Sequence, residues 1–191
     1  MIHCLYRTNG VDTAYIIVYD GGMELIHTTI NVKYLPLPNK VEFIKTYKMA
    51  PADLTRTSFV IPFINSDHVV MANNRRRGFE LPGGHVELDE TLSQAAQREC
   101  LEETGFEIDN LVPLGYLKMT SEGEVPSDWK YPHPISYQQF FTGETSKWTP
   151  YEPNDECKHP VLFPITHLDG LTEQQIMLIL EAHQMVYPNG D

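Results

Sequence analysis

Short runs of apolar and β-branched residues near the start of the chain predict a small β element. Ala14–Tyr19 (AYIIVY) is an apolar run with high strand propensity, and Asp20–Gly22 follows it as a hairpin-type turn. Met23–Val32 then has the pattern of a return strand. Leu35–Lys40 carries two prolines and predicts a turn or short linker. Residues 1–52 are therefore expected to form an N-terminal β extension of unassigned role, either as extra sheet or as a contact in a homodimer.

The hydrophobic pattern from residue 53 to residue 191 predicts one domain with strands and two helices. Helical periodicity covers Glu90–Thr104, with Asp89 as the expected N-cap and Gly105 as the stop. It also covers Thr172–Val186, which Thr172 or its neighbour is expected to cap. Strands are predicted at Ser58–Ile64, His68–Ala72, Leu114–Met119, Ile135–Phe141 and Val161–Phe163. This order predicts a mixed α/β or α+β fold, with a helix on each face of a sheet.

Composition narrows the class of protein without identifying it. The 191 residues are 41% hydrophobic, which is enough for a core, and the formal net charge is −12. Duplex nucleic acid is not an expected partner, because phosphate contacts need clustered cations. The odd count of three cysteines argues against a disulfide framework, and no stretch approaches the ~18 apolar residues of a membrane span. We expect a soluble, cytoplasmic protein that is not membrane-bound.

The strongest chemical signal is a group of glutamates on the first predicted helix. Glu99, Glu102 and Glu103 are spaced i, i+3 and i+4, which places them on neighbouring positions of one helical face. Like charges at this spacing repel, at a cost of roughly 0.2–0.5 kcal/mol per pair. Such a run is often only a solvated helix face. Here Gly84 and Arg98 accompany it, and three carboxylates together suit a hard cation such as Mg²⁺ or Mn²⁺.

The segment from Gly84 to Phe106 (GHVELDETLSQAAQRECLEETGF) resembles the Nudix box, G-x5-E-x7-R-E-U-x-E-E-x-G-U, in which U is a bulky apolar residue. Phe106 fills the last apolar position, and Cys100 stands where Ile, Leu or Val is usual. Cysteine is a mild departure, since a buried free Cys behaves as a small hydrophobe. The seven fixed positions are filled by Gly84, Glu90, Arg98, Glu99, Glu102, Glu103 and Gly105.

This resemblance implies a Nudix fold, with a mixed sheet between helices. It also implies hydrolysis of a diphosphate linkage in a small nucleotide-like substrate with Mg²⁺ or Mn²⁺. Glu99, Glu102 and Glu103 would be the metal ligands, helped by the carbonyl of Gly83, and Arg98 would organise them. The general base would be Glu102, Glu103 or a glutamate of a later loop, for which Glu156 is the candidate.

Substrate contacts are predicted less directly. Arg75 and Arg77 precede the box and carry charge suited to phosphate, although an arginine-rich hairpin turn is more often only a solvated surface. Trp129 and Tyr131 lie in a long polar stretch and are candidates for stacking on a base. Patterns that the resemblance associates with ADP-ribose, dinucleoside polyphosphate or NADH hydrolysis are missing, which leaves a nucleoside triphosphate or a nucleotide sugar in favour.

Two other functions share the fold. A nucleotide-binding sensor with little or no catalysis would be expected to have lost some of the glutamates, and all three are intact. A diphosphate isomerase would need a cysteine-bearing motif that the sequence does not offer.

Overall fold

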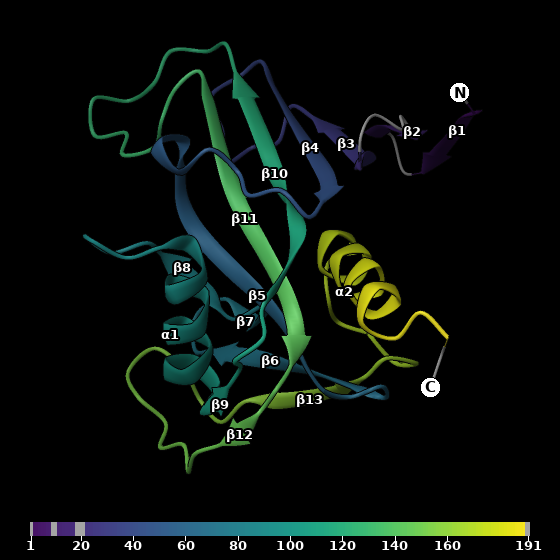
Figure 1. Cartoon of the computed structure of the whole chain (residues 1–191). Coiled ribbons are helices and arrows are strands. Elements are labelled where there is room, and N and C mark those ends of the chain that lie inside the picture. Colours follow the sequence, from purple (N-terminus) through teal and green to yellow (C-terminus); the bar gives the residue numbers. More distant parts are fainter. Residues whose placement is uncertain (1, 9–10, 18–21, 190–191) are drawn as a thin grey trace. The chain divides into compact units, whose positions relative to one another are not determined.

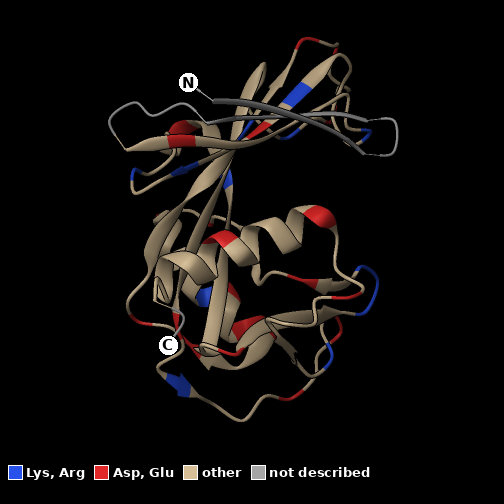
Figure 2. Ribbon diagram, turned by 90° about the vertical axis from the view of Figure 1, so that its right-hand side faces the viewer, with Lys and Arg blue, Asp and Glu red and all other residues tan. Residues whose placement is uncertain are grey.

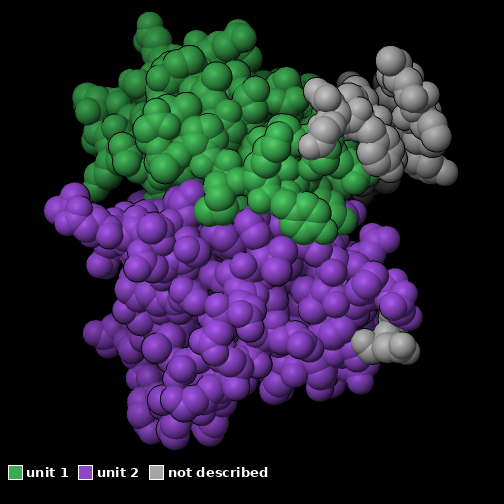
Figure 3. All heavy atoms as spheres, viewed as in Figure 1, with its two compact units in different colours: residues 1–56, 115–139 green, residues 57–114, 140–191 purple. Residues whose placement is uncertain are grey.

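The computed structural model describes residues 2–8, 11–17 and 22–189, with side chains from Gly22 onward. The chain divides into two compact units (Figure 3). Unit 1 comprises Met1–Arg56 and Gly115–Gln139, and unit 2 comprises Thr57–Leu114 and Phe140–Asp191. Each unit is thus built from two separate stretches of the chain. The assignment of residues 1–52 to a domain of their own stays a prediction.

Unit 1 consists mainly of strands. In it β4 pairs with β3 on one side and β10 on the other, both antiparallel, and β11 follows β10 in the strand order. A separate antiparallel pair is formed by β1 and β2. The bounds of these elements are β1 Ile2–Thr8, β2 Val11–Ile17, β3 Met23–Ile30, β4 Asn39–Thr46, the 3₁₀ turn η1 Ala52–Leu54, β10 Val112–Ser121 and β11 Ile135–Glu144.

The strand β4 was missed by the sequence analysis. The predicted turn at Leu35–Lys40 is confirmed only as far as Pro38, because Asn39 and Lys40 already belong to the strand. Val41 and Phe43 are buried and alternate with more exposed residues, as expected for a strand with one covered face. Pro36 and Pro38 just before the strand led to the prediction of a turn, so the start of this alternation was not recognised.

Unit 2 contains the sheet that positions the Nudix-like segment Gly84–Phe106. Its strands are ordered β13–β6–β5–β11, with the short β7 beside β6 and β8 beside β5. The pairs β13–β6 and β5–β6 are antiparallel, whereas β5 and β11 run in the same direction (Figure 1), so the sheet is mixed. Its elements are β5 Thr55–Asn65, β6 His68–Asn74, β7 Gly78–Glu80, β8 Gly83–His85, β9 Phe106–Glu107, β12 Lys147–Trp148 and β13 Val161–Pro164.

Two helices cover opposite faces of this sheet, α1 (Leu92–Thr104) and α2 (Glu173–Val186) (Figure 1). Alternate residues of β5 serve the two layers. Val60 lies in one buried cluster with Ala96 of α1, whereas the Phe63 ring lies 5.6 Å from the His183 ring of α2, between centroids. The predicted fold class, a mixed sheet sandwiched between helices, is confirmed.

The first helix begins two residues later than its pattern predicted, and the prediction of Asp89 as N-cap is wrong. Thr91 is the N-cap: its Oγ1 accepts a hydrogen bond from the Gln94 backbone N–H at 3.2 Å, and the Gln94 Oε1 accepts from the Thr91 N–H at 2.9 Å. This reciprocal capping box satisfies two donors, which Asp89 alone does not offer. Asp89 instead has φ 63° in the loop before the helix. Gly105 ends the helix in the left-handed conformation, φ 74°, as predicted.

The other predicted elements are confirmed with small shifts of their ends. Thr172 caps α2 through a second capping box, and β5, β6, β10, β11 and β13 each extend their predicted strands by one to three residues at one or both ends. The end of the first predicted strand and most of its turn, residues 18–21, lie outside the described residues. Within the described part of the chain, no helix is both long enough and apolar enough to cross a bilayer.

Replacement of Thr91 by Ala should lower the free energy of unfolding by about 1 kcal/mol, because the capping hydrogen bond to Gln94 is lost. Urea denaturation followed by circular dichroism measures the change. Thr91→Ser, which keeps the hydroxyl, is the matched control and should stay near the wild type. Equal stability of the Ala variant and the wild type would contradict the cap.

Candidate active site

The candidate site lies in unit 2, where β8 leads through a loop into α1. Residue Gly83 of β8 pairs with Phe59 of β5, which anchors the start of the loop to the sheet. A Cβ at Gly84 would collide with the Glu99 carboxylate, so only glycine lets this carboxylate approach the strand. At the far end of the loop, the Glu90 side chain accepts a hydrogen bond from the Glu87 N–H at 3.0 Å.

Arg98 is the hub of this site. Its guanidinium forms a forked pair with Glu90, at 3.0 Å from Nε to Oε1 and 3.1 Å from Nη2 to Oε2. The Nη1 atom donates to Glu99 Oε1 at 2.9 Å and to Glu102 Oε2 at 3.0 Å, and Nη2 also donates to the His85 carbonyl at 3.0 Å. These hydrogen bonds, the pair with Glu90 foremost, raise the pKa of Arg98. The same pair is the main cause of the lowered pKa of Glu90. One arginine thus ties three carboxylates and the loop together.

The three glutamates of the helix occupy different depths. Glu102 is 57% exposed, whereas Glu103 is only 7% exposed. Glu103 turns inward: its Oε2 accepts from the Gly83 backbone N–H at 3.0 Å, and its Oε1 faces the Cys157 thiol at 3.8 Å. Glu99 lies between these extremes, with its side chain 16% exposed. The three carboxylates, predicted to share one helical face, therefore differ in exposure, from the buried Glu103 to the exposed Glu102.

Burial is the main electrostatic influence on the inner two carboxyl groups. Burial first, and then the negative charges of Glu99, Glu156 and Glu80, raise the pKa of Glu103 to about 7, against the opposing hydrogen bond from Gly83. Burial also raises the pKa of Glu99, partly offset by Arg98. Carboxylates held this close in a low-dielectric setting favour a proton or a cation beside them.

Carboxylate oxygens in mutual repulsion fit a hard divalent cation by their chemistry. Among the residues that the structure describes, however, no three or more His, Cys, Asp or Glu side chains are gathered around one point as a ready cage. Arg98 holds Glu99 and Glu102 by one oxygen each, and Glu103 is turned toward Gly83. The donor set fits Mg²⁺ or Mn²⁺, and its ligands would converge by rotation of side chains.

The loop that carries Glu156 is fastened to the end of β6, close to the helix glutamates. Asn74 Nδ2 donates to Glu156 Oε1 at 3.4 Å, and the Arg75 N–H donates to the Glu156 carbonyl at 2.9 Å. After burial, the negative charge of Glu156 is one of the smaller influences that raise the pKa values of Glu99 and Glu103. The structure thus brings this predicted residue to the same cluster.

The two predicted phosphate-binding arginines contact protein groups in this structure. Arg77 Nε donates to Glu80 Oε2 at 2.7 Å, and its Nη2 lies 3.6 Å from Glu156 Oε1. Arg75 Nε donates to the Asn154 carbonyl at 2.8 Å. Glu80 is therefore a member of the charged cluster that sequence reasoning missed, since nothing in its short segment marks it.

The predicted stacking residues belong to unit 1, whereas the glutamates belong to unit 2. The rings of Trp129 and Tyr131 meet edge to face, with centroids 5.5 Å apart. Their role in base stacking stays a prediction. Along the described parts of the ribbon, lysines and arginines occupy several separate positions (Figure 2).

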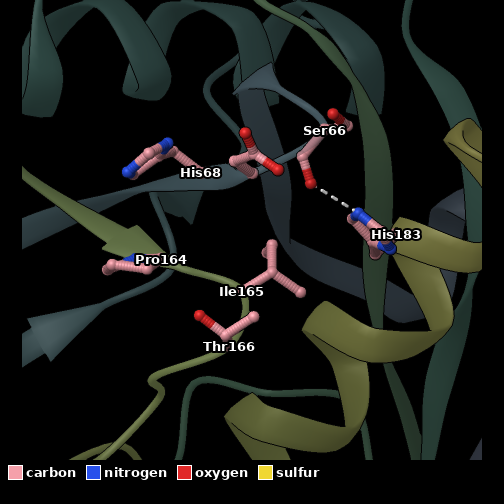
Figure 4. Close-up of a pocket in the computed structure, with 7 residues that line it drawn as sticks. Ser66, His68, Pro164, Ile165, Thr166 and His183 are labelled. Atoms are coloured by element: carbon pink, nitrogen blue, oxygen red, sulfur yellow. Dashed lines mark hydrogen bonds between the residues drawn. The ribbon is translucent and has the colours of Figure 1, made fainter. Parts of the chain in front are cut away.

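A separate pocket of about 350 Å³ lies at the β5–β6 turn, the end of β13 and α2 (Figure 4). The His183 ring contacts the Ser66 carbonyl through Nε2 at 2.7 Å on its wall. No residue of the Nudix-like segment lines it, so it is not the candidate site. Its lining residues are Ser66, Asp67, His68, Pro164, Ile165, Thr166 and His183.

Comparison with known families agrees with this fold. The NUDIX domain model matches residues 54–178, which is more than half of the chain, so the protein belongs to the NUDIX domain family. The match includes both the glutamate helix and the Glu156 loop.

Curated relatives match shorter stretches. An oxidized purine nucleoside triphosphate hydrolase of Danio rerio is 40% identical over 60 residues, 29% of this chain and 38% of the relative. A Bacillus subtilis (strain 168) protein provisionally named an 8-oxo-dGTP diphosphatase is 39% identical over 56 residues, 29% of this chain and 35% of the relative. The matches thus span less than two fifths of the length of these two relatives.

Among solved structures, a pyrophosphohydrolase of Bacillus subtilis is similar with a TM-score of 0.60. It is 21% identical, and the match covers 81% of this chain and 98% of that one. At this identity the likeness concerns the fold alone, and it confirms the Nudix architecture.

Glu103 should make the metal-free protein less stable as the pH rises. Its folded pKa of about 7 lies above the ordinary 4.5, so its protonated form is favoured in the folded state. The stabilisation is complete below pH 4.5 and is lost as the pH rises through 7, by up to roughly 3 kcal/mol. Glu90, whose pKa is lowered, acts in the opposite sense and only at more acidic pH.

Urea denaturation in EDTA at several pH values between 5 and 8 measures this dependence. Glu103→Gln should flatten it, whereas Glu152→Gln, an exposed change, should leave it intact. Parallel curves for the wild type and Glu103→Gln would contradict the assignment; this comparison also cancels the titration of the eight histidines.

Proposed function

We propose that this protein is a divalent-metal-dependent hydrolase that cleaves a diphosphate linkage in a small nucleotide-like substrate. The observation that carries the proposal is the carboxylate cluster of α1 and the Glu156 loop, in which the buried Glu103 is repelled by Glu99, Glu156 and Glu80, at a position the family uses for its box. A cation bound among these oxygens would relieve the repulsion.

In the proposed mechanism Glu99, Glu102 and Glu103 hold Mg²⁺ or Mn²⁺, together with the Gly83 carbonyl. When bound, the metal neutralises phosphate oxygens and lowers the pKa of a coordinated water. Arg98 holds Glu99 and Glu102 in register through Nη1, so it positions the ligands. Its forked pair with Glu90 keeps the guanidinium itself from rotating.

Glu156 is the proposed acceptor of the proton from the attacking water. It lies in the loop fastened to β6, and Arg77 is close to its Oε1 at 3.6 Å. A carboxylate outside the metal-binding helix suits this role, because a group that donates its electron pairs to a cation is a weaker base. Arg75 and Arg77 are proposed to bind phosphate by exchanging their present protein partners for substrate oxygens.

The proposed substrate class is a nucleoside triphosphate, with oxidised purine nucleoside triphosphates first to be tested. Two relatives at about two fifths identity carry names of this class, although each match covers a minority of both chains. Nucleotide sugars are the second class. The two described cysteines are free thiols, which supports a reducing compartment such as the cytoplasm.

Purified protein with Mg²⁺ should hydrolyse at least one compound of a panel of dNTPs, 8-oxo-dGTP, ADP-ribose, nucleotide sugars and dinucleoside polyphosphates. Release of phosphate and pyrophosphate is the readout. Glu102→Gln should lower kcat by about 10²-fold or more, since a ligand to the metal is lost. Glu173→Gln, an exposed change at the start of α2, should leave the rate unchanged.

No turnover on any compound, combined with tight binding of one of them, would overturn the proposed hydrolase activity and favour a nucleotide sensor. Turnover that persists in EDTA would overturn the role of the metal.

Glu156→Gln should lower kcat by about 10²-fold or more while the affinity for Mn²⁺ stays within about twofold, because a general base is removed but no ligand. The matched control is Glu152→Gln in the same loop, which should behave like the wild type. A Glu156→Gln variant with normal kcat would return the role of base to a glutamate of the helix.

A further inference from the structure

A small buried cluster of Ala72, Tyr151 and Cys157 lies behind Glu103. The Cys157 side chain is fully buried, and its Sγ is 3.8 Å from Glu103 Oε1 with the thiol as donor. The other oxygen of the same carboxylate accepts from the Gly83 backbone N–H. Each oxygen of Glu103 therefore has one donor, and the two donors come from different segments of the chain.

The thiol is held in place by its own backbone rather than by the contact with Glu103. The Cys157 N–H donates to Asn154 Oδ1 at 2.7 Å, and the Asn154 N–H donates to the Cys157 carbonyl at 3.0 Å. The following residue, Lys158, donates its N–H to the Asn73 carbonyl at 2.9 Å. Asn74 and Cys157 form an isolated antiparallel β-bridge. A donor fixed in this way restricts the orientation of the group that accepts from it.

Tyr151 adds an independent observation to this cluster. Its side chain packs beside Cys157 with 9% exposure, and its hydroxyl is buried with no hydrogen-bond partner among the described residues. Cys157 and Glu103 are among the groups that act electrostatically on this hydroxyl. Buried polar atoms without partners are uncommon and call for a reason.

We propose that Cys157 is a positioning residue that fixes the Glu103 carboxylate for cation binding. The thiol holds Oε1 and Gly83 holds Oε2, while Tyr151, whose hydroxyl has no hydrogen-bond partner among the described residues, packs beside the thiol. Preset orientation of a ligand raises metal affinity, because less freedom is lost on binding. The inference rests on the proposed function in one respect, namely that Glu103 is a metal ligand.

Mn²⁺ affinity, measured from the electron paramagnetic resonance signal of free Mn²⁺, tests the proposal without substrate. Cys157→Ala should weaken Mn²⁺ binding by about three- to tenfold. This loss is smaller than is usual when a hydrogen bond to a metal ligand is removed, because a thiol is a weak donor. Cys157→Ser keeps a donor and should remain within about twofold of the wild type.

Cys100→Ser is the matched control for loss of a buried thiol, because Cys100 is fully buried on α1 but bonds to Thr104 instead of a glutamate. It should change the melting temperature but not the Mn²⁺ affinity. Unchanged affinity in Cys157→Ala would overturn the proposal. Equal losses in Cys157→Ala and Cys157→Ser would also overturn it, because packing alone would then be the cause.

The infrared S–H stretching band of the metal-free protein separates this inference from the proposed function. Subtraction of the Cys157→Ser spectrum isolates the Cys157 band, and Glu103→Gln should shift it because the acceptor changes. A band that does not respond to Glu103→Gln overturns the inference even if the protein binds metal. A shifted band in a protein that binds no Mn²⁺ supports the thiol contact and overturns the hydrolase mechanism instead.

Discussion

One guanidinium holds the loop and the helix of the candidate site together. Arg98 contacts Glu90, Glu99, Glu102 and the His85 carbonyl, so a single side chain joins the end of β8, the connecting loop and α1. Lysine has no planar fork and would leave some of these acceptors unpaired. The charges are still not balanced, because Glu103 and the Glu156 loop contribute negative charge that Arg98 does not contact. The remaining excess of negative charge is what the proposed cation would offset.

The sequence predicts the structure best where a feature depends only on residues close to it along the chain. The seven fixed residues of the box predicted the loop–helix arrangement, and Gly105 predicted the end of α1, because few residues adopt its left-handed backbone. The N-cap was harder to predict. Asp89 and Thr91 both have suitable side chains, and the choice depends on the reciprocal bond with Gln94, three residues beyond the true cap.

Long-range features of the site escaped the sequence analysis. Spacing placed Glu99, Glu102 and Glu103 on one helical face, but only packing against the sheet determines that Glu103 is buried and Glu102 exposed. Cys157 lies 54 positions beyond Glu103, and no periodicity connects them. Glu156 was predicted because the resemblance leads one to expect a loop acid, whereas its neighbour Cys157 became visible only through the fold.

The two compact units divide the chain in a way that constrains its synthesis. Unit 1 needs residues 115–139 as well as the first 56, and unit 2 needs residues 140–191 in addition to 57–114. Neither unit is a continuous segment, so neither is complete on a ribosome until most of the chain has emerged. The glutamate helix is made early, but the loop with Glu156 and Cys157 follows about fifty residues later. In the nascent chain, Arg98 is therefore present with the acidic helix from the start, whereas the loop whose Cys157 thiol contacts Glu103 is still missing.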